Sequence, residues 1–517
     1  MTRQLDLADI QGNILEDFVR NFPAARFVFL QVTDPAAGRA FILEYRAKVT
    51  TALRWGKSDS YIGESLATKP KVAINIGLTF SGFLALELPT RTLAKMPPEF
   101  IDGMKTRAEI LGDDVGANVS SRWDPVWTDR PHILIGLNAL LLDSGKPVPE
   151  LDQETQVLQQ LCAKHKLKIM TGHRNPASPD WQDASAILVK NEATYKPVPQ
   201  EHFGFVDGIS NPVFEGQFGD ANVEQIMAVG NGKILEGGQW GALATGEFLL
   251  GHPDEAQETG AIASPPEVMR NGTFLVYRKL HENVASFDAY IDKMAQSYAA
   301  LMSVPLDDAR NIIKAKMVGR WPDGVPLAVA PTIAEWKKFN AQPADATQNG
   351  ISRLVDFKYG DDPDGLKCPV TAHSRRTNTR DGLVRNGKTS ALNNRRRILR
   401  RGLPYGSSAA AEDRLDEREH GIIFLAMCAS LPRQFEFVQQ QWLNYGLDAN
   451  AGNDTCPLLG NRAGDAKFLI PVDPESGDAP FICNDIPQFV EVRGGDYFFL
   501  PSMTALRMIG MGIVDPT

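Results

Sequence analysis

The order of apolar segments predicts an α+β fold with two similar halves. In the first half, runs typical of strands alternate with a helical pattern, and the connections are too irregular for a parallel-sheet repeat. The second half has a similar order of elements, with strand-like runs separated by a long amphipathic helix. No short internal repeat is visible in the sequence, so the likeness of the halves lies in their order of elements.

Three apolar stretches predict strands in the first half, and the second of them is broken at Ser81 and Gly82. They are residues 25–32, 72–86 and 132–142. Residues 151–165 predict a helix, because four apolar side chains recur on one face. A short strand at residues 168–170 then leads toward a glycine-rich loop.

The second half contains four more strand-like runs. They are residues 247–250, 274–278, 421–430 and 497–500. Ser286 is the predicted N-cap of a helix with an apolar stripe that includes Phe287 and Tyr298, and residues 434–442 predict another helix. The polar stretch from about 343 to 394 is expected to be an irregular surface loop, and loops of this length are often functional.

Composition places the chain among soluble globular proteins. It has 517 residues, 43% of them hydrophobic, and a net charge of −9, which does not suggest a nucleic-acid binder. The five cysteines are scattered without a Cys-x-x-Cys pair, so they indicate neither a disulfide framework nor a zinc site. The N-terminus lacks an apolar leader and no apolar run is long enough for a bilayer, so we expect a cytoplasmic protein without membrane contact.

Residues 204–208, Gly-Phe-Val-Asp-Gly, form the most informative stretch. Glycine permits backbone conformations that other residues avoid, so the chain here could pass close to a large flat ligand. Apolar neighbours would partly desolvate Asp207 and raise its pKa, as a proton shuttle requires. Asp-Gly is also ordinary turn chemistry, and the stretch alone favours a turn.

His373 is followed by three arginines within seven positions, in the stretch 368–380. An imidazole beside several guanidinium groups suits a ligand with an iron that prefers nitrogen and an anionic periphery, and haem with its two propionates is such a ligand. The competing interpretation is an exposed basic turn.

Five arginines lie within residues 395–401. Such a run can indicate a docking patch for nucleic acid or another anionic partner. However, the chain is acidic, Ile398 and Leu399 interrupt the run, and the following Gly402, Pro404 and Gly406 impose a turn. An arginine fixed in this way could stabilise a developing negative charge.

With these segments the sequence resembles the dye-decolourising peroxidase family. The family's Gly-x-x-Asp-Gly, its proximal-histidine segment and its Arg-Arg-Gly-x-Pro-Tyr-Gly motif match residues 204–208, 368–380 and 400–406. Weaker matches are residues 9–15, 434–442 and 494–501, so the resemblance spans nearly the whole chain. It implies two ferredoxin-like halves with antiparallel sheets, at residues 1–195 and 196–517, and a haem b pocket in the second half.

The resemblance also implies roles for individual residues. His373 would ligate the haem iron, and Asp207 would be the acid–base catalyst on the opposite, distal face. Arg400 would be the distal partner of Asp207, although the adjacent Arg401 stays a possibility. Arg380 would approach a haem propionate, with Arg375 as a second candidate.

Three further residues would surround the haem. Ile422 and Phe424 would form an apolar wall, and Glu436 would accept a hydrogen bond from His373, which would make the imidazole a stronger donor.

The resemblance implies a haem peroxidase that reduces hydrogen peroxide and oxidises bulky dyes and phenolic compounds in one-electron steps. Electrons could reach the haem through surface aromatics, with Tyr405 and Trp442 as candidates against plain packing. The alternative function is a haem-binding or iron-releasing protein with little peroxidase turnover. The sequence leaves the natural reductant, the oligomeric state and an encapsulating partner open.

Overall fold

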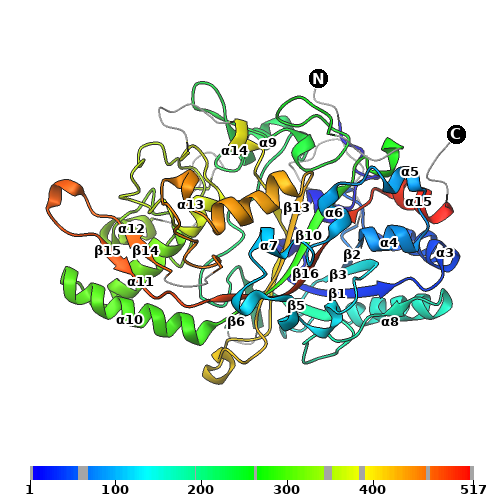
Figure 1. Cartoon of the computed structure of the whole chain (residues 1–517), viewed down its shortest axis with the longest axis horizontal. Helices are drawn as coiled ribbons and strands as arrows, with labels where there is room; N and C mark the ends of the chain where they lie inside the picture. Colours follow the sequence, from blue (N-terminus) through cyan, green and yellow to red (C-terminus); the bar gives the residue numbers. More distant parts are fainter. Residues whose placement is uncertain are drawn as a thin grey trace.

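One curved antiparallel sheet flanked by helices dominates the computed structural model (Figure 1). The structure describes residues 4–55, 68–191, 194–260, 265–342, 352–383, 391–461 and 466–512. All the pairs between named strands are antiparallel, including those that join distant segments. The predicted α+β class is therefore confirmed.

The sheet contains strands from both halves of the chain, in the order β11–β13–β10–β16–β2–β3–β1–β4. The strands from the first half are β1 (Ala24–Gln31), β2 (Val72–Leu78), β3 (Ile133–Ala139), β4 (Lys168–Ile169) and β5 (Gln182–Ser185). Those from the second half are β10 (Thr273–Glu282), β11 (Leu399–Arg400), β12 (Leu403–Tyr405), β13 (Gly421–Cys428) and β16 (Val490–Leu500).

The halves join where Phe499 of β16 pairs with Leu78 of β2. At the other end, β5 pairs with β1, β12 pairs with β13, and β12 lies beside β5. The sheet therefore curves until its ends approach each other. Whether the halves divide at residues 195 and 196 stays a prediction.

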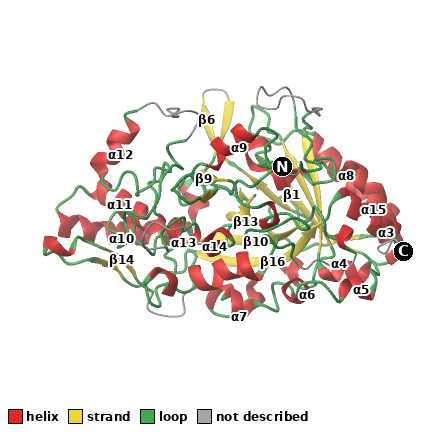
Figure 2. Ribbon diagram, turned by 90° about the horizontal axis from the view of Figure 1, so that it is seen from above, coloured by secondary structure: helices red, strands yellow, loops and turns green. Residues whose placement is uncertain are grey.

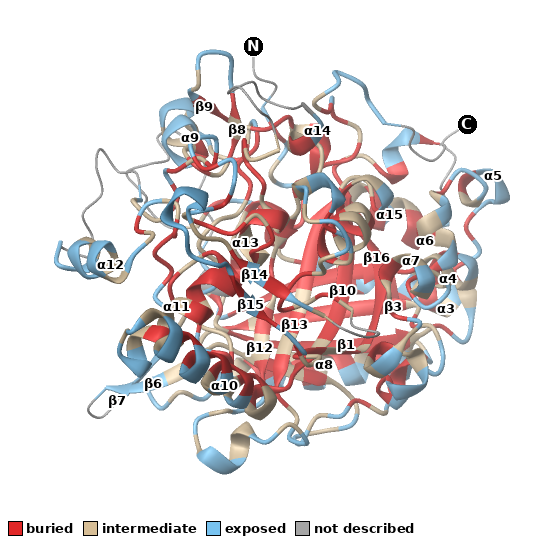
Figure 3. Cartoon of the chain, turned by 60° about the vertical axis from the view of Figure 1, so that its left-hand side comes forward, coloured by how far each residue is buried: buried red, intermediate tan, exposed pale blue. Residues whose placement is uncertain are grey.

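Aromatic side chains fill the space inside the curved sheet. Phe29 of β1 lies 5.3 Å from the ring of Tyr277 on β10 and stacks at 6.0 Å on Phe498 of β16. All three are buried, and Figure 3 shows that buried residues concentrate on these strands while the outer helix faces are exposed. Strands from the two halves thus share one core, in which each aromatic pair contributes about 0.5–1.5 kcal/mol beyond its buried area.

Helices cover the outside of the sheet, as the view from above shows (Figure 2). The longer ones are α3 (Pro35–Tyr45), α8 (Glu150–Lys164), α10 (Val284–Met302), α11 (Leu306–Val318) and α15 (Met503–Met511). Shorter helices are α1 (Gly12–Leu15), α2 (Phe18–Asn21), α4 (Phe80–Ala85), α5 (Thr90–Leu93), α6 (Pro98–Asp102), α7 (Ala108–Leu111), α9 (Ala221–Ala228), α12 (Ile333–Asn340), α13 (His373–Thr377) and α14 (Ala391–Asn394). Three small hairpins pair β6 (Ile187–Asn191) with β7 (Thr194–Val198), β8 (Lys233–Ile234) with β9 (Trp240–Gly241), and β14 (Phe468–Ile470) with β15 (Phe481–Cys483).

Helix α10 carries the predicted buried stripe, but its predicted start is wrong. The helix begins at Val284, with Asn283 as its N-cap. Ser286 lies in the first turn, where its backbone N–H and hydroxyl contact Asp416. A carboxylate from a distant loop thus binds N–H groups that the sequence assigned to a local cap.

Two segments predicted as strands are not strands. Residues 80–85 form α4 after the N-cap Thr79, so the break at Ser81–Gly82 lies inside a helix. The strand predicted at 247–250 is instead the last residue of a 3₁₀ turn at Thr245–Glu247 followed by turn residues, and the buried Glu247 side chain binds Arg433 at 2.8 Å. The helix predicted at 434–442 is present, as two π-helical segments at Pro432–Glu436 and Val438–Leu443.

The polar stretch at 343–394 is described only in part. Residues 352–383 are mostly irregular and contain the short helix α13, and the segments 343–351 and 384–390 lie outside the described residues. Among the described helices, none combines the length and the apolar character that crossing a membrane requires.

Candidate active site

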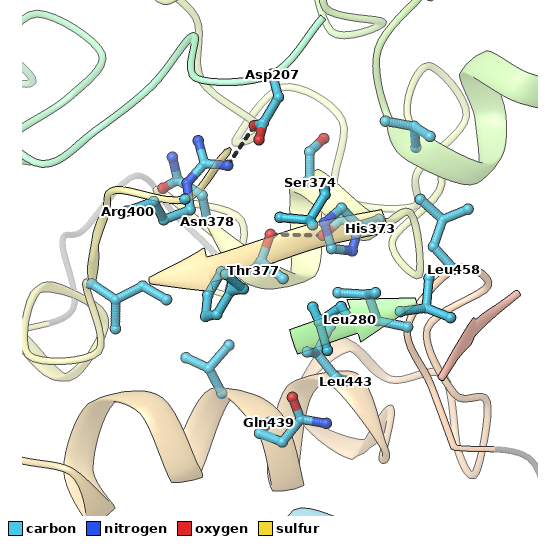
Figure 4. A pocket seen from close by; sticks show the side chains of 18 of the residues that line it. Asp207, Leu280, His373, Ser374, Thr377, Asn378, Arg400, Gln439, Leu443 and Leu458 are labelled. Atoms are coloured by element: carbon cyan, nitrogen blue, oxygen red, sulfur yellow. Dashed lines mark hydrogen bonds and ion pairs between the residues drawn. The ribbon is translucent and has the colours of Figure 1, made fainter. Parts of the chain in front are cut away.

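A cavity with a volume of about 290 Å³ lies between the second-half strands and the irregular segments around α13. Five of the sequence-predicted site residues with polar or aromatic side chains line it: Asp207, His373, Arg380, Arg400 and Phe424. Ile422 also lines it, whereas Arg375 and Glu436 do not. The close-up in Figure 4 shows Asp207 and Arg400 pointing toward each other, with His373 entering from α13.

The loop that carries Asp207 depends on its two glycines. Gly204 has a φ of 93° and Gly208 a φ of 72°, and a Cβ at either position would meet no atom within 4 Å. The requirement for glycine is therefore conformational and not one of space. The N–H of Gly208 donates to Asp207 Oδ1 at 2.6 Å, which turns the carboxylate back onto its own loop.

Arg400 is bound to this loop at three points. Its Nη1 donates to Asp207 Oδ1 at 2.7 Å and its Nη2 to the Ser210 carbonyl at 3.0 Å. Its backbone N–H donates to Asn211 Oδ1 at 3.1 Å. The Ser-Asn that follows the glycine motif thus orients the arginine, which the sequence alone did not indicate.

The side chains of Arg400 and Arg401 point in opposite directions, and this decides which of them can be the distal partner of Asp207. Arg401 is buried and donates from Nε to the Asn13 carbonyl at 2.8 Å and from Nη2 to the Ile14 carbonyl at 3.1 Å. It therefore ties the sheet to the first helix, and Arg400 is the member of the pair that faces the cavity.

The predicted rise in the pKa of Asp207 is wrong. Burial within the protein acts to raise the pKa, but the Arg400 guanidinium and the Gly208 N–H outweigh burial and hold the pKa below its ordinary value of 3.8. Half of the side-chain surface of Asp207 is accessible, because it borders the cavity. Apolar neighbours alone suggested desolvation, whereas the arginine partner lies 193 residues away in the sequence.

His373 is the first residue of α13, and its backbone carbonyl accepts a 2.9 Å hydrogen bond from the Thr377 hydroxyl. Its ring Nδ1 lies 3.3 Å from Cys456 Sγ. Burial acts to raise the pKa of the Cys456 thiol, but His373 and Arg376 together lower it to about 6. Because Nδ1 is within hydrogen-bonding distance of the sulfur, Nε2 is the ring nitrogen available to bind a metal or another group.

Glu436 is not the partner of His373, contrary to the sequence-based prediction. Its carboxylate accepts from Arg107 Nη2 at 2.7 Å and from the Tyr497 hydroxyl at 2.8 Å. The glutamate is buried away from the cavity, where it links the π-helical segment to Arg107, the N-cap residue of α7, and to Tyr497 on β16. Cys456 takes the predicted place beside His373.

Of the two arginines predicted to approach an anionic group, Arg380 lines the cavity and Arg375 does not. Arg375 does not reach the cavity, because its buried guanidinium binds Asp362 Oδ2 at 2.8 Å and the Cys368 carbonyl at 2.6 Å. Arg380 lines the cavity and donates from Nη1 to the carbonyls of Val355 and Phe357. Within the described part of the chain its buried Nη2 has no hydrogen-bond partner, and burial lowers the pKa of Arg380 to about 9.

The arginine run at 395–401 is used inside the protein. Arg395 binds Asp254 at 2.7 Å, and Arg397 donates to the carbonyls of Gly232 and Asn231. None of the five arginines is exposed. Arg397 and Arg401 are buried, and the other three are only partly exposed and bind groups of the protein itself, which argues against a surface docking patch.

Tyr405 and Trp442, the two candidate electron relays, are both buried. Trp442 donates from Nε1 to Asp448 at 2.9 Å, and the Lys279 ammonium lies 4.7 Å from the centre of the Tyr405 ring. Neither is a surface aromatic, so the surface part of that expectation is wrong.

Two glutamates on the cavity wall were not singled out in the sequence. Glu201 accepts from the N–H groups of Phe203 and Phe205, both at 2.7 Å, and a hydrogen bond joins its carboxyl to that of Glu282. Burial raises the pKa of both; the charge of Asp207 also acts to raise that of Glu201, and the charge of Glu201 that of Glu282, so the pair holds a proton under conditions where isolated glutamates would not. Their spacing of 81 positions carries no sequence signal.

The fold and this cavity define an α+β protein in which an acid–arginine pair and a histidine line the same cavity. Comparison with known proteins supports the same conclusion. A family model described as the DyP dimeric alpha+beta barrel domain matches residues 9–169, and one described as Dyp-type peroxidase, C-terminal, matches residues 330–471.

Named relatives match over nearly the whole chain. Peroxidase 2 of Mycetinis scorodonius is 27% identical over 97% of this chain and 87% of its own length. The multifunctional dye peroxidase DyP2 of an Amycolatopsis species is also 27% identical, over 97% of this chain and 96% of its own. A fungal DyP-type peroxidase from Auricularia auricula-judae has the same fold, with a TM-score of 0.71 at 24% identity, covering 98% of this chain and all of the other.

The chain belongs to the dye-decolourising peroxidase family. It is an enzyme of that type, from a family that depends on haem, and the expectation of two ferredoxin-like halves agrees with its antiparallel sheet.

Proposed function

We propose that the cavity binds haem b with His373 as the protein ligand to iron, and that Asp207 and Arg400 together activate hydrogen peroxide. The observation that carries this proposal is the presence of all three side chains in one cavity, with Asp207 and Arg400 joined at 2.7 Å. Haem, when bound, supplies the redox chemistry that the family requires.

The residues present fit such a group. The walls carry apolar side chains suited to a porphyrin face, among them Leu280, Ile422, Phe424 and Leu443. Arg380 brings a buried guanidinium whose Nη2 has no protein partner among the described residues, and a haem propionate would satisfy it. His373 offers the one ring nitrogen that the sulfur of Cys456 does not occupy.

Asp207 is suited to accept and return a proton. Arg400 holds its pKa low, so the residue is a carboxylate at neutral pH and can take a proton from the inner oxygen of peroxide. Among the described residues, both the Arg400 and Gly208 donors bind Oδ1, which leaves Oδ2 for that proton. The same oxygen can then deliver the proton to the outer oxygen, which leaves as water.

Arg400 cannot exchange a proton in this way, because a guanidinium stays charged at any working pH. Its contacts with Asp207 and Ser210 fix its position before peroxide arrives. A preorganised cation of this kind stabilises the charge that develops as the oxygen–oxygen bond breaks.

The reducing substrates would be dyes and phenolic compounds. One solved dye-decolourising peroxidase of the same fold was determined in complex with 2,6-dimethoxyphenol, at a TM-score of 0.72 and 24% identity. The balanced reaction takes one peroxide and two phenols to two waters and two phenoxyl radicals, so each phenol loses one electron and one proton.

The test is to load the purified chain with haem and compare it with His373→Ala. We expect the native protein to bind one haem, measured as pyridine haemochromogen, and to oxidise an anthraquinone dye and 2,6-dimethoxyphenol only when peroxide is added. His373→Ala should lose the native iron spectrum, while His165→Ala, a histidine paired with Glu44 outside the cavity, should keep it.

Two outcomes would count against the proposal. An unchanged spectrum in His373→Ala would move the ligand role to another residue. Stable haem binding without dye oxidation would instead favour the alternative function, a haem-binding or iron-releasing protein with little turnover.

A further inference from the structure

The environment of Cys456 fixes its sulfur beside His373. The residue is completely buried. Its backbone N–H donates to the Leu443 carbonyl at 2.7 Å, and its own carbonyl accepts from the Gly460 N–H at 3.0 Å. The bound backbone fixes the Cα, and complete burial leaves the side chain little room to turn away from the 3.3 Å contact with His373 Nδ1.

Arg376 strengthens this arrangement from the histidine's own helix. Its Nη2 donates to the Asp454 carbonyl at 2.9 Å, two residues before the cysteine, and its side chain also bonds to Cys456. Helix α13 and the segment around Cys456 are therefore joined at several points. The contact between sulfur and imidazole is one of several that join these two segments.

The direction of the hydrogen bond follows from the tautomer. An imidazole that binds iron through Nε2 carries its remaining proton on Nδ1. The sulfur at 3.3 Å must then accept that N–H. A hydrogen-bond acceptor for the Nδ1–H orients the imidazole ring. It also makes the other ring nitrogen, which would ligate the iron, a stronger electron donor.

We propose that Cys456 is a positioning residue for His373, whose sulfur accepts the Nδ1–H hydrogen bond that the sequence assigned to a carboxylate. This inference rests on the proposed role of His373 as iron ligand. Glu436 is committed to Arg107 and Tyr497 and is not available for this task. The electron density on iron in this enzyme is therefore set in part by a sulfur acceptor.

The experiment compares three substitutions at one position in the haem-loaded full-length chain. Cys456→Ala and Cys456→Val remove the acceptor, and Val also fills the space. Cys456→Asp restores an acceptor with a carboxylate. Cys483→Ala is the matched control, because Cys483 is equally buried, on β15, and packs in an apolar cluster.

The readouts are the ferric/ferrous midpoint potential and the iron–histidine stretching frequency of the ferrous protein. Loss of the acceptor makes the imidazole a weaker donor to iron, so we expect Cys456→Ala and Cys456→Val to raise the midpoint potential. The expected rise is at least about 59 mV, which corresponds to a tenfold change in the one-electron redox equilibrium constant. The stretching frequency should fall in the same variants. Asp should return both towards native values, and Cys483→Ala should change neither.

Unchanged midpoint potentials in Cys456→Ala and Cys456→Val would overturn this inference. They would leave the proposed role of His373 as haem ligand unaffected. A shift in Ala and Val that Asp fails to reverse would also overturn it, because packing and not hydrogen bonding would then be the cause. If His373→Ala keeps the native iron spectrum, the proposed ligand and this inference both fall. If Ala loses haem, Val and Asp supply the same comparison at nearly native side-chain volume.

Discussion

Arg400 Nη1 donates to Asp207 Oδ1 at 2.7 Å across 193 residues of sequence. The contact joins the glycine loop to β11, and Asn211 of the same loop binds the Arg400 backbone at 3.1 Å. One loop therefore positions both the acid and the cation. Substitutions at these two residues should separate proton transfer from charge stabilisation.

Asp207→Asn keeps the shape of the side chain but removes its ability to take a proton. We expect haem to remain bound and the reaction with peroxide to slow about 10²–10⁴-fold, the usual contribution of a general acid–base group. Stopped-flow absorbance after mixing with peroxide measures the rate. Asp288→Asn is the control, because Asp288 pairs with Arg414 at 2.5 Å with similar exposure but outside the cavity.

Arg400→Leu removes the cation and releases the carboxylate. The loss in rate should be about 10²–10³-fold, or about 3 kcal/mol, on the scale of a deleted oxyanion donor. The same stopped-flow assay applies, with Arg414→Leu as the matched control. Native rates in both Asp207→Asn and Arg400→Leu would show that this pair is not the peroxide site.

Arg380→Leu should shorten the residence time of haem. The buried Nη2 of Arg380 has no partner among the described residues, and we infer that a propionate pairs with it. Transfer of haem to an excess of apomyoglobin measures the dissociation rate, which we expect to rise at least about tenfold for the loss of a charge-assisted hydrogen bond. Arg380→Lys keeps the charge and should show a smaller change; equal rates in Leu and native protein would contradict the assignment.

The sequence was informative where function depends on a local motif. The positive φ values of Gly204 and Gly208 follow from a short stretch with its own conformational requirement. The arginine motif narrowed the distal partner only to Arg400 or Arg401. The family resemblance placed Ile422 and Phe424 beside the haem, and the alternation of side chains along β13 explains why both line the cavity.

Partner choice across the fold could not be predicted in the same way. Cys456 meets His373 across 83 residues, and nothing in its surroundings in the sequence marks it. Glu436 was chosen by its charge and its place in a motif, but its helix directs it toward Arg107. The predicted sign of the pKa shift at Asp207 was wrong because it was inferred from the apolar neighbours alone, without the charge of Arg400.

Arg375→Leu should act on stability and not on the cavity. The guanidinium and Asp362 are both buried and lie 2.8 Å apart, so removal of one leaves an uncompensated buried charge. We expect a loss of about 3–5 kcal/mol in the free energy of unfolding, measured by urea denaturation. Arg310→Ala, which breaks accessible ion pairs with Asp292 and Asp307, should cost much less, because exposed ion pairs contribute little to stability. Equal losses in the two variants would argue against a buried structural role.

The low pKa of Asp207 predicts how activity depends on pH. A carboxylate must be ionised to accept the first proton, and Arg400 and the Gly208 N–H keep it ionised below its ordinary pKa of 3.8. We therefore expect kcat/KM for peroxide to persist into acidic solution, with its acid limb below that value. Removal of Arg400 leaves burial as the dominant influence, and burial raises the pKa.

In Arg400→Leu the acid limb of the kcat/KM profile should therefore move to higher pH. The maximum value of kcat/KM should also be lower than in the native enzyme. The measurement is kcat/KM for peroxide at closely spaced pH values in the native enzyme, in Arg400→Leu and in the control Arg414→Leu. The control should reproduce the native limb, because its ion pair lies outside the cavity. If the limb stays in place in Arg400→Leu, a group other than Asp207 accepts the proton, and the buried Glu201–Glu282 pair on the same wall would be the next to test.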